Sequence, residues 1–176
     1  TNNTTASNNT AVGYQSAHSN TTGANNTFLG FAVGYANSTG TENLGVGGQG
    51  ASSNTTLRFN TTGSYNTALG ISALAANTTA NNNTALGYQA LKLNTTGASN
   101  VAVGMQAMNE NSTASNNTAV GFKSLPSNTT GTANTALGNL ELTASYATMN
   151  NNTTGSYNVA IGSGALSRNT TDASNT

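Results

Sequence analysis

The spacing of glycine constrains this chain more than any other feature of its sequence. A five-residue phrase of the type Asn-Thr/Val-Ala-aliphatic-Gly recurs from end to end, and its glycines keep one constant spacing that only two longer gaps interrupt. A fixed period of about 17 residues indicates one supersecondary unit copied many times, stacked as a solenoid rather than folded as a globular enzyme. The repeat glycines are Gly13, Gly30, Gly47, Gly70, Gly87, Gly104, Gly121, Gly138 and Gly162, with the longer gaps after Gly47 and Gly138.

One unit reads as a strand, a bend, a second short extended segment and a turn. In Asn83-Thr-Ala-Leu-Gly87, a β-branched, a small and an aliphatic residue favour a short strand, and the glycine suits a bend or a close approach between coils. The later phrase Asn94-Thr-Thr-Gly97 is typical of a turn. Apolar residues are too sparse for helices. We therefore predict an all-β fold, a parallel β-solenoid or β-roll with coils of about 17 residues, with a trimer as its expected assembly.

The alternation of side chains along a strand predicts which residues form the core. The first and third residues after Asn share a face, and the third is apolar in every copy, so we predict that this face is the interior. A second apolar anchor follows four residues after most repeat glycines, for example Leu74 and Leu91, whereas Leu57–Phe59 and Thr143–Met149 read as insertions that bulge from a turn. The predicted core row is Val12, Leu29, Val46, Leu69, Leu86, Val103, Val120, Leu137 and Ile161.

Charge is nearly absent, and this excludes several classes of function. Only 5% of the residues are charged and the formal net charge is zero, so the sequence predicts neither nucleic-acid binding nor attraction to anionic lipid. No apolar run reaches the ~18 residues of a membrane span, and no insertion into a membrane is expected. The chain has no cysteine for a disulfide framework. Because apolar residues return at fixed positions, order is favoured over disorder.

The ends and the surface of the array favour self-association. Residues 1–176 read as a single repeat array of about ten coils, and both ends fall inside the repeat pattern, as expected for a segment of a longer repetitive chain or for a filament subunit. Large residues often follow the repeat glycine, and an exposed apolar stripe there would form an interface. The expected partner is the chain itself, in a trimer or an end-to-end filament. The residues of this post-glycine stripe are Tyr14, Phe31, Ile71, Tyr88, Met105 and Phe122.

The sequence predicts no catalytic, cofactor-binding or metal-binding residue. His18 is the only histidine, and a triad would have to join it to a distant acid such as Glu42. A calcium-binding β-roll needs an Asp in each repeat, but Asp172 is the only one. The glycine-rich stretch Gly45–Gly50 lacks the Lys-Ser/Thr of a phosphate-binding loop. We therefore expect a protein that is not an enzyme.

Two further readings come from the abundance of Asn and Thr. Asn-x-Ser/Thr sequons are frequent and would accept glycans on a glycosylating export route, although turn residues in an Asn-Thr ladder explain them as well. Rows of threonine also raise ice binding as an alternative function, although no regular Thr-x-Thr row runs through all copies. The candidate glycosylation sites are Asn20, Asn60, Asn94, Asn128 and Asn169.

The phrases Asn100-Val-Ala-Val-Gly104 and Asn158-Val-Ala-Ile-Gly162 resemble the short repeat of trimeric autotransporter adhesin heads. The unit from Asn83 to Gly97 also resembles repeats of phage and bacterial tail-fibre-like proteins. The resemblance covers the whole chain and implies a parallel β-roll, three chains about an axis, and an extracellular place on a cell surface, a secreted filament or a virion appendage. The expected function is a structural fibre or adhesin segment, or a phage tail-fibre shaft, with a host-surface glycan or protein as an expected partner.

Overall fold

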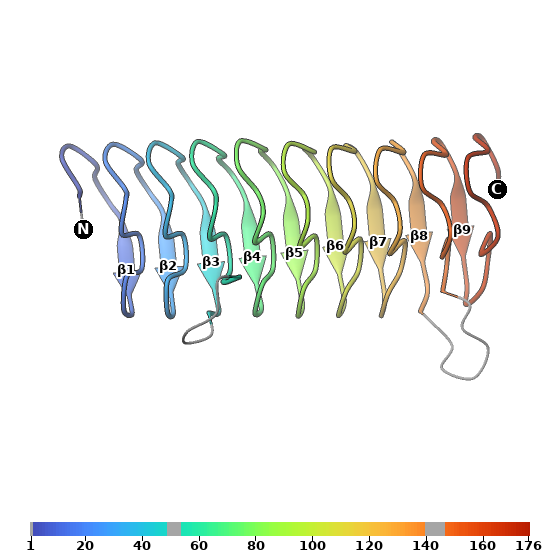
Figure 1. Ribbon diagram of the computed structural model, residues 1–176, viewed down its shortest axis with the longest axis horizontal. Coiled ribbons are helices and arrows are strands. Elements are labelled where there is room, and N and C mark those ends of the chain that lie inside the picture. Colours follow the sequence, from blue (N-terminus) through green and yellow to red (C-terminus); the bar gives the residue numbers. More distant parts are fainter. Residues whose placement is uncertain (1, 49–53, 140–146) are drawn as a thin grey trace.

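The computed structural model describes residues 2–48, 54–139 and 147–176, which wind into a parallel β-solenoid (Figure 1). Each coil contributes one three-residue strand, and the strands lie side by side in a single sheet in the order of the sequence. No helix occurs in these residues. The predicted all-β parallel solenoid is therefore confirmed. The strands are β1 (Thr10–Val12), β2 (Thr27–Leu29), β3 (Leu44–Val46), β4 (Thr67–Leu69), β5 (Thr84–Leu86), β6 (Val101–Val103), β7 (Thr118–Val120), β8 (Thr135–Leu137) and β9 (Val159–Ile161).

Equivalent positions of the repeat stand opposite one another in every strand pair. In β5 and β6, for example, Thr84 pairs with Val101 and Leu86 pairs with Val103, the same place in the next copy of the repeat. The two longer gaps keep this register, since β3 pairs with β4 and β8 with β9 through equivalent positions as well. The register is therefore unchanged across both longer gaps, and one coil corresponds to one repeat of the glycine phrase.

The predicted core row is wrong by one residue, because the opposite face of each strand points inward. The third strand residues are half-buried or exposed, and Val12, Leu29 and Ile161 expose 57%, 37% and 71% of their surface. The second strand residue is the buried one: Ala85 is completely inaccessible. The outward residues of the predicted row are Val12, Leu29, Val46, Leu69, Leu86, Val103, Val120, Leu137 and Ile161.

The interior is thin, and this explains the choice of face. Across the core from Ala85 lies the returning segment of the coil, whose Leu91 is also completely buried. One small strand residue and one large residue on the returning segment fill the space between the two layers at protein packing density. The prediction of a second apolar anchor is thus confirmed in the coils whose predicted anchor the structure describes. The spacing predicts two further anchors at Ala51 and Leu142, and both lie outside the described residues. The buried anchors are Ala17, Leu57, Leu74, Leu91, Met108, Leu125 and Met149.

The prediction that Leu57–Phe59 and Thr143–Met149 bulge from a turn is wrong at Leu57 and Met149. Both side chains are fully buried, and both have a φ of 50°, like Leu74 and Leu91. They take the anchor place in the two long coils, so the additional residues precede them in the sequence. Of the second predicted insertion, Thr143–Tyr146 lies outside the described residues.

The repeat glycines fulfil the predicted role at the bend. Gly104 has a φ of 128°, and a Cβ at this position would lie 2.5 Å from the carbonyl oxygen of Gly121 in the next coil. Coils stacked at the ~4.8 Å spacing of β-strands leave no room for a side chain at that place. The glycines therefore allow close stacking as well as the turn of the backbone.

Candidate functional site

Two ladders of asparagine brace each Asn-Thr-Thr-Gly turn. Asn94 donates one Nδ2 hydrogen to Oδ1 of Asn77 at 3.1 Å and the other to the carbonyl of Gly97 at 2.9 Å, and its own Oδ1 accepts from Asn111 at 2.9 Å. The Asn94 amide is therefore saturated inside the protein. This turn ladder comprises Asn20, Asn37, Asn60, Asn77, Asn94, Asn111, Asn128, Asn152 and Asn169.

The second ladder runs just before the strands and meets the first at the same carbonyl groups. Asn83 donates Nδ2 to the carbonyl of Gly97, which Asn94 also contacts, and its Oδ1 accepts from the backbone N–H and the amide of Asn100. The two ladders thus hold the turn between them. This strand ladder comprises Asn9, Asn26, Asn43, Asn66, Asn83, Asn100, Asn117, Asn134, Asn158 and Asn175.

The turn ladder overturns the candidate glycosylation sites in the folded chain. A glycan bonded to Nδ2 would replace one of the hydrogens that the ladder uses. It would also need a path to solvent, which the buried sites lack. Asn60, Asn94 and Asn128 are completely inaccessible and Asn20 is 3% exposed; Asn169, at the last coil, has both amide hydrogens donated. The candidate sites Asn20, Asn60, Asn94, Asn128 and Asn169 are therefore structural residues.

The outward side of the sheet is a flat surface without charge, which we call the sheet face. It consists of the first and third residues of β1–β9, and these are Thr, Val, Leu or Ile in every strand. All of these side chains are half-buried or exposed. The post-glycine stripe adjoins the end of each strand, with Tyr14, Tyr88 and Met105 exposing 65%, 45% and 45% of their surface and Phe122 half-buried. Contiguous apolar surface of this kind is a candidate interface.

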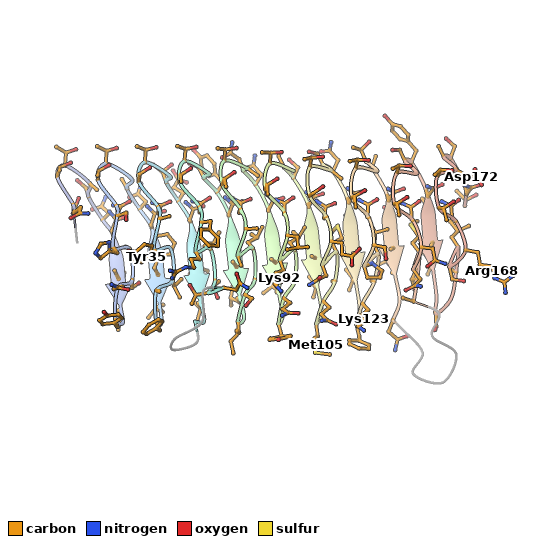
Figure 2. The ribbon with its side chains drawn as sticks, viewed as in Figure 1. Tyr35, Lys92, Met105, Lys123, Arg168 and Asp172 are labelled. Atoms are coloured by element: carbon orange, nitrogen blue, oxygen red, sulfur yellow. The ribbon has the colours of Figure 1, made fainter. Side chains whose placement is uncertain are left out.

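The other broad side of the rod carries the cations, and we call it the basic face. It is formed by the returning segments, which lie across the core from the sheet. Their outward side chains include Arg58, Lys92, Lys123 and Arg168. Tyr35, Lys92, Lys123 and Arg168 follow one another along the length of the rod (Figure 2).

Aromatic contacts hold the cation at the N-terminal part of the basic face. The rings of His18 and Tyr35 stack with centroids 4.9 Å apart, and the Arg58 guanidinium lies 4.8 Å from the Tyr35 centroid and 5.7 Å from that of Phe59. The Nε of Arg58 is buried without a hydrogen-bond partner. The protein therefore uses this side chain for stacking and leaves part of its polar capacity unfilled.

A polar hollow of about 420 Å³ lies further along the basic face. Gln106, Asn109, Glu110, Lys123 and Asn150 line it together with Pro126 and Ser127. Amide, carboxylate and ammonium groups are all present, so the hollow fits a hydroxylated ligand better than an apolar one.

The structure brings no catalytic or metal-binding set together in the residues that it describes. His18 lies in the stack described above, and it contacts Ser19 at 3.4 Å rather than an acid. In the described part of the chain no three His, Cys, Asp or Glu side chains form a group that could hold a metal ion. Among the same residues no helix is long and apolar enough to cross a membrane. The basic face was not predicted from the sequence. One signal could have indicated it, since every cation lies after a repeat glycine and before the next asparagine of the turn ladder.

Comparison of the chain with protein-family models, with curated proteins and with solved structures gave no match. The features of this chain that bear on function are therefore the sheet face, the basic face and the two Asn ladders.

Proposed function

We propose that this chain is a segment of an extracellular structural fibre or adhesin, a stiff β-solenoid rod that serves surface attachment or filament assembly. One observation carries the proposal: the backbone pairing of the parallel strands, the turn ladder and the strand ladder all continue along the whole described array, including its two long coils. Each coil is bonded to the next at three places around its circumference, so bending the rod would break several ladders at once. A rod of this kind holds a binding surface away from the structure that carries it.

The proposed partner is a second and third copy of the same chain, packed through the sheet face. This surface carries no charge, so copies meet without electrostatic repulsion, and its Val, Leu and Ile side chains gain from burial. The resemblance to trimeric adhesin heads supports a trimer, and a tail-fibre shaft would use the same rod geometry. The proposed place is a cell surface, a secreted filament or a virion appendage.

Substitution of Leu86 tests this packing. Leu86 lies at the middle of the sheet face and is half-buried, so Leu86→Asp should leave the coil folded but place a charge in the interface. We expect sedimentation equilibrium to show an oligomer for the unchanged chain and a monomer with unchanged β-type circular dichroism for the variant. Asn81→Asp, an exposed change of the same charge, should leave the oligomer intact. A monomeric unchanged chain at high concentration would refute the packing.

Ice binding is the competing function, and its surface would be the exposed column formed by the second threonine of each turn. This column is one residue wide, because the first residue of each pair turns its hydroxyl along the axis, as Thr95 does to the carbonyl of Ser112 at 3.0 Å. The geometry thus favours the rod over a flat two-row ice surface. Thermal hysteresis in dilute protein that is lost on Thr96→Leu and Thr113→Leu would favour ice binding over the rod function.

A further inference from the structure

The described cations of this chain are confined to one side of the rod. All four follow a repeat glycine and precede the next Asn of the turn ladder, so they lie on the basic face. Glu42 and Asp172 lie instead in the turn segments between the two ladders, and of the acids described only Glu110 shares the basic face. Glu141 lies outside the described residues. A chain with zero net charge therefore has one side that is locally positive.

The cations are also regularly spaced along the axis. Arg58 follows β3, Lys92 follows β5, Lys123 follows β7 and Arg168 follows β9, which places one cation in every second coil. Two coil spacings amount to roughly 10 Å along the rod. This is about the length of one disaccharide in an extended polysaccharide.

None of these cations is neutralised within the described part of the chain. The Arg58 guanidinium lies over the rings of Tyr35 and Phe59, Lys123 lies 5.6 Å from the Phe122 ring, and no described acid forms an ion pair with any of the four. An anionic ligand would therefore gain charge-assisted hydrogen bonds without displacing an acidic partner.

We infer that the basic face binds a linear acidic polysaccharide that lies along the rod axis. Its carboxylates or sulfates would meet the successive cations, its hydroxyls the amides of the hollow around Gln106 and Asn109, and its sugar rings the exposed ring of Phe59. The inference rests on the proposed attachment role and names its ligand class. Binding in solution can nevertheless be measured whether or not the chain self-associates.

Other polyanions fit the face less well. Duplex DNA carries one charge per ~1.7 Å and binds through many closely spaced phosphate contacts, whereas this face offers four separated cations. An acidic peptide that bound by strand addition would need a free strand edge, yet the backbone here is already bonded between coils, as in Leu91 N–H to the Ala107 carbonyl and Leu93 N–H to that of Asn109. A saccharide requires no backbone edge.

The test is a calorimetric titration of the full chain with hyaluronan, a polysaccharide that has one carboxylate per disaccharide. Neutral dextran, poly-glutamate and a thymidine oligonucleotide serve as comparison ligands. We expect saturable binding of hyaluronan, tighter for oligosaccharides long enough to reach two cations. Arg58→Gln and Lys92→Gln should each weaken binding by about two- to fivefold, and the melting temperature should be unchanged for Lys92→Gln, which removes no stacking contact.

Two acid variants provide a matched control. Glu110→Gln removes the described acid of the basic face and should tighten binding by about twofold, whereas Glu42→Gln makes the same change of net charge in a turn segment and should have no effect. The inference would be overturned if Glu110→Gln and Glu42→Gln changed the affinity for hyaluronan equally. It would also be overturned if dextran bound as tightly as hyaluronan, or if poly-glutamate or the oligonucleotide bound more tightly. None of these outcomes would bear on the rod itself, which the sedimentation experiment tests separately.

Discussion

At the scale of single residues, the molecule depends on asparagine amides and on glycines without a Cβ. An amide has two donors and an acceptor, so one Asn per coil can bond to the coil before it, the coil after it and its own turn. A buried hydrogen bond of this type contributes about 1 kcal/mol net, and its loss leaves unsatisfied partners that cost more. The repeated Asn is therefore a structural requirement rather than an effect of composition.

Replacing Asn94 by Asp should be severe, because a carboxylate cannot donate and would face the Oδ1 of Asn77 and the carbonyl of Gly97. We expect Asn94→Asp to lower the free energy of unfolding by about 3–5 kcal/mol at neutral pH. Burial raises the pKa of the new carboxyl above its unfolded value, so part of the stability should return as the pH falls from that raised pKa toward about 4, below which the carboxyl is protonated in both states and no further change follows.

Asn81→Asp is the control for this change. Asn81 is exposed, and its Oδ1 accepts from the backbone N–H of Ser64 at 2.7 Å, a bond that an Asp carboxylate preserves. Chemical denaturation at several pH values should therefore separate the two variants. Equal stabilities would show that the turn ladder does not stabilise the fold as assigned.

Two repeat glycines separate the steric and conformational demands on this position. Both Gly104 and Gly162 have a positive φ, of 128° and 108°, but an added Cβ would strike the next coil only at Gly104 and would meet nothing within 4 Å at Gly162. Thermal melts should show Gly104→Ala to be much more destabilising than Gly162→Ala, whose cost is the backbone term of about 1–2 kcal/mol. Similar losses would mean that the coils can separate to admit a methyl group.

At the scale of one element, each coil is a fixed volume shared between a strand residue and an anchor. Most coils combine Ala on the strand with Leu or Met on the returning segment, whereas the second coil combines Phe28 with Gly34. A Cβ on Gly34 would lie 2.7 Å from the Phe28 ring. The large and the small residue have thus exchanged sides of the core while the space stays filled.

This exchange predicts a coupled pair of substitutions. Phe28→Ala leaves a cavity and should cost about 3–5 kcal/mol, and Gly34→Leu alone should be disfavoured by the clash with the ring. The double variant reproduces the Ala–Leu pair of the Leu74 coil, whose anchor already has a φ of 50°, so it should be more stable than either single variant. If the changes in unfolding free energy of the two single variants simply added in the double variant, the two residues would not share one volume.

At the scale of the whole molecule, the rod has two chemically different broad sides. The sheet face is apolar and uncharged, and the basic face carries the unpaired cations. A bundle packed through the sheet faces would leave the basic faces on its outside, so assembly and attachment need not compete for the same surface.

Salt should separate the two proposed functions, assembly through the sheet face and polysaccharide binding on the basic face. Screening at high ionic strength weakens contacts between exposed charges but not apolar burial. Raising sodium chloride from about 0.05 M to about 0.5 M should weaken hyaluronan binding several-fold and leave the sedimentation of the oligomer unchanged. Dissociation of the oligomer under the same conditions would assign its interface to the charged side instead.

The sequence by itself determined the period, the parallel stacking in register and the need for glycine at the bend, because these follow from repetition and from backbone geometry. It did not determine which face of the strand points inward. Alternation groups Thr84 with Leu86 and separates both from Ala85, but both faces contain apolar residues, and hydrophobicity favoured the wrong one. Only the tertiary structure decided the choice, because the thin space beneath the sheet is already occupied by Leu91 and admits only a small residue opposite it. The confinement of the cations to one side also required the coil to be closed in three dimensions.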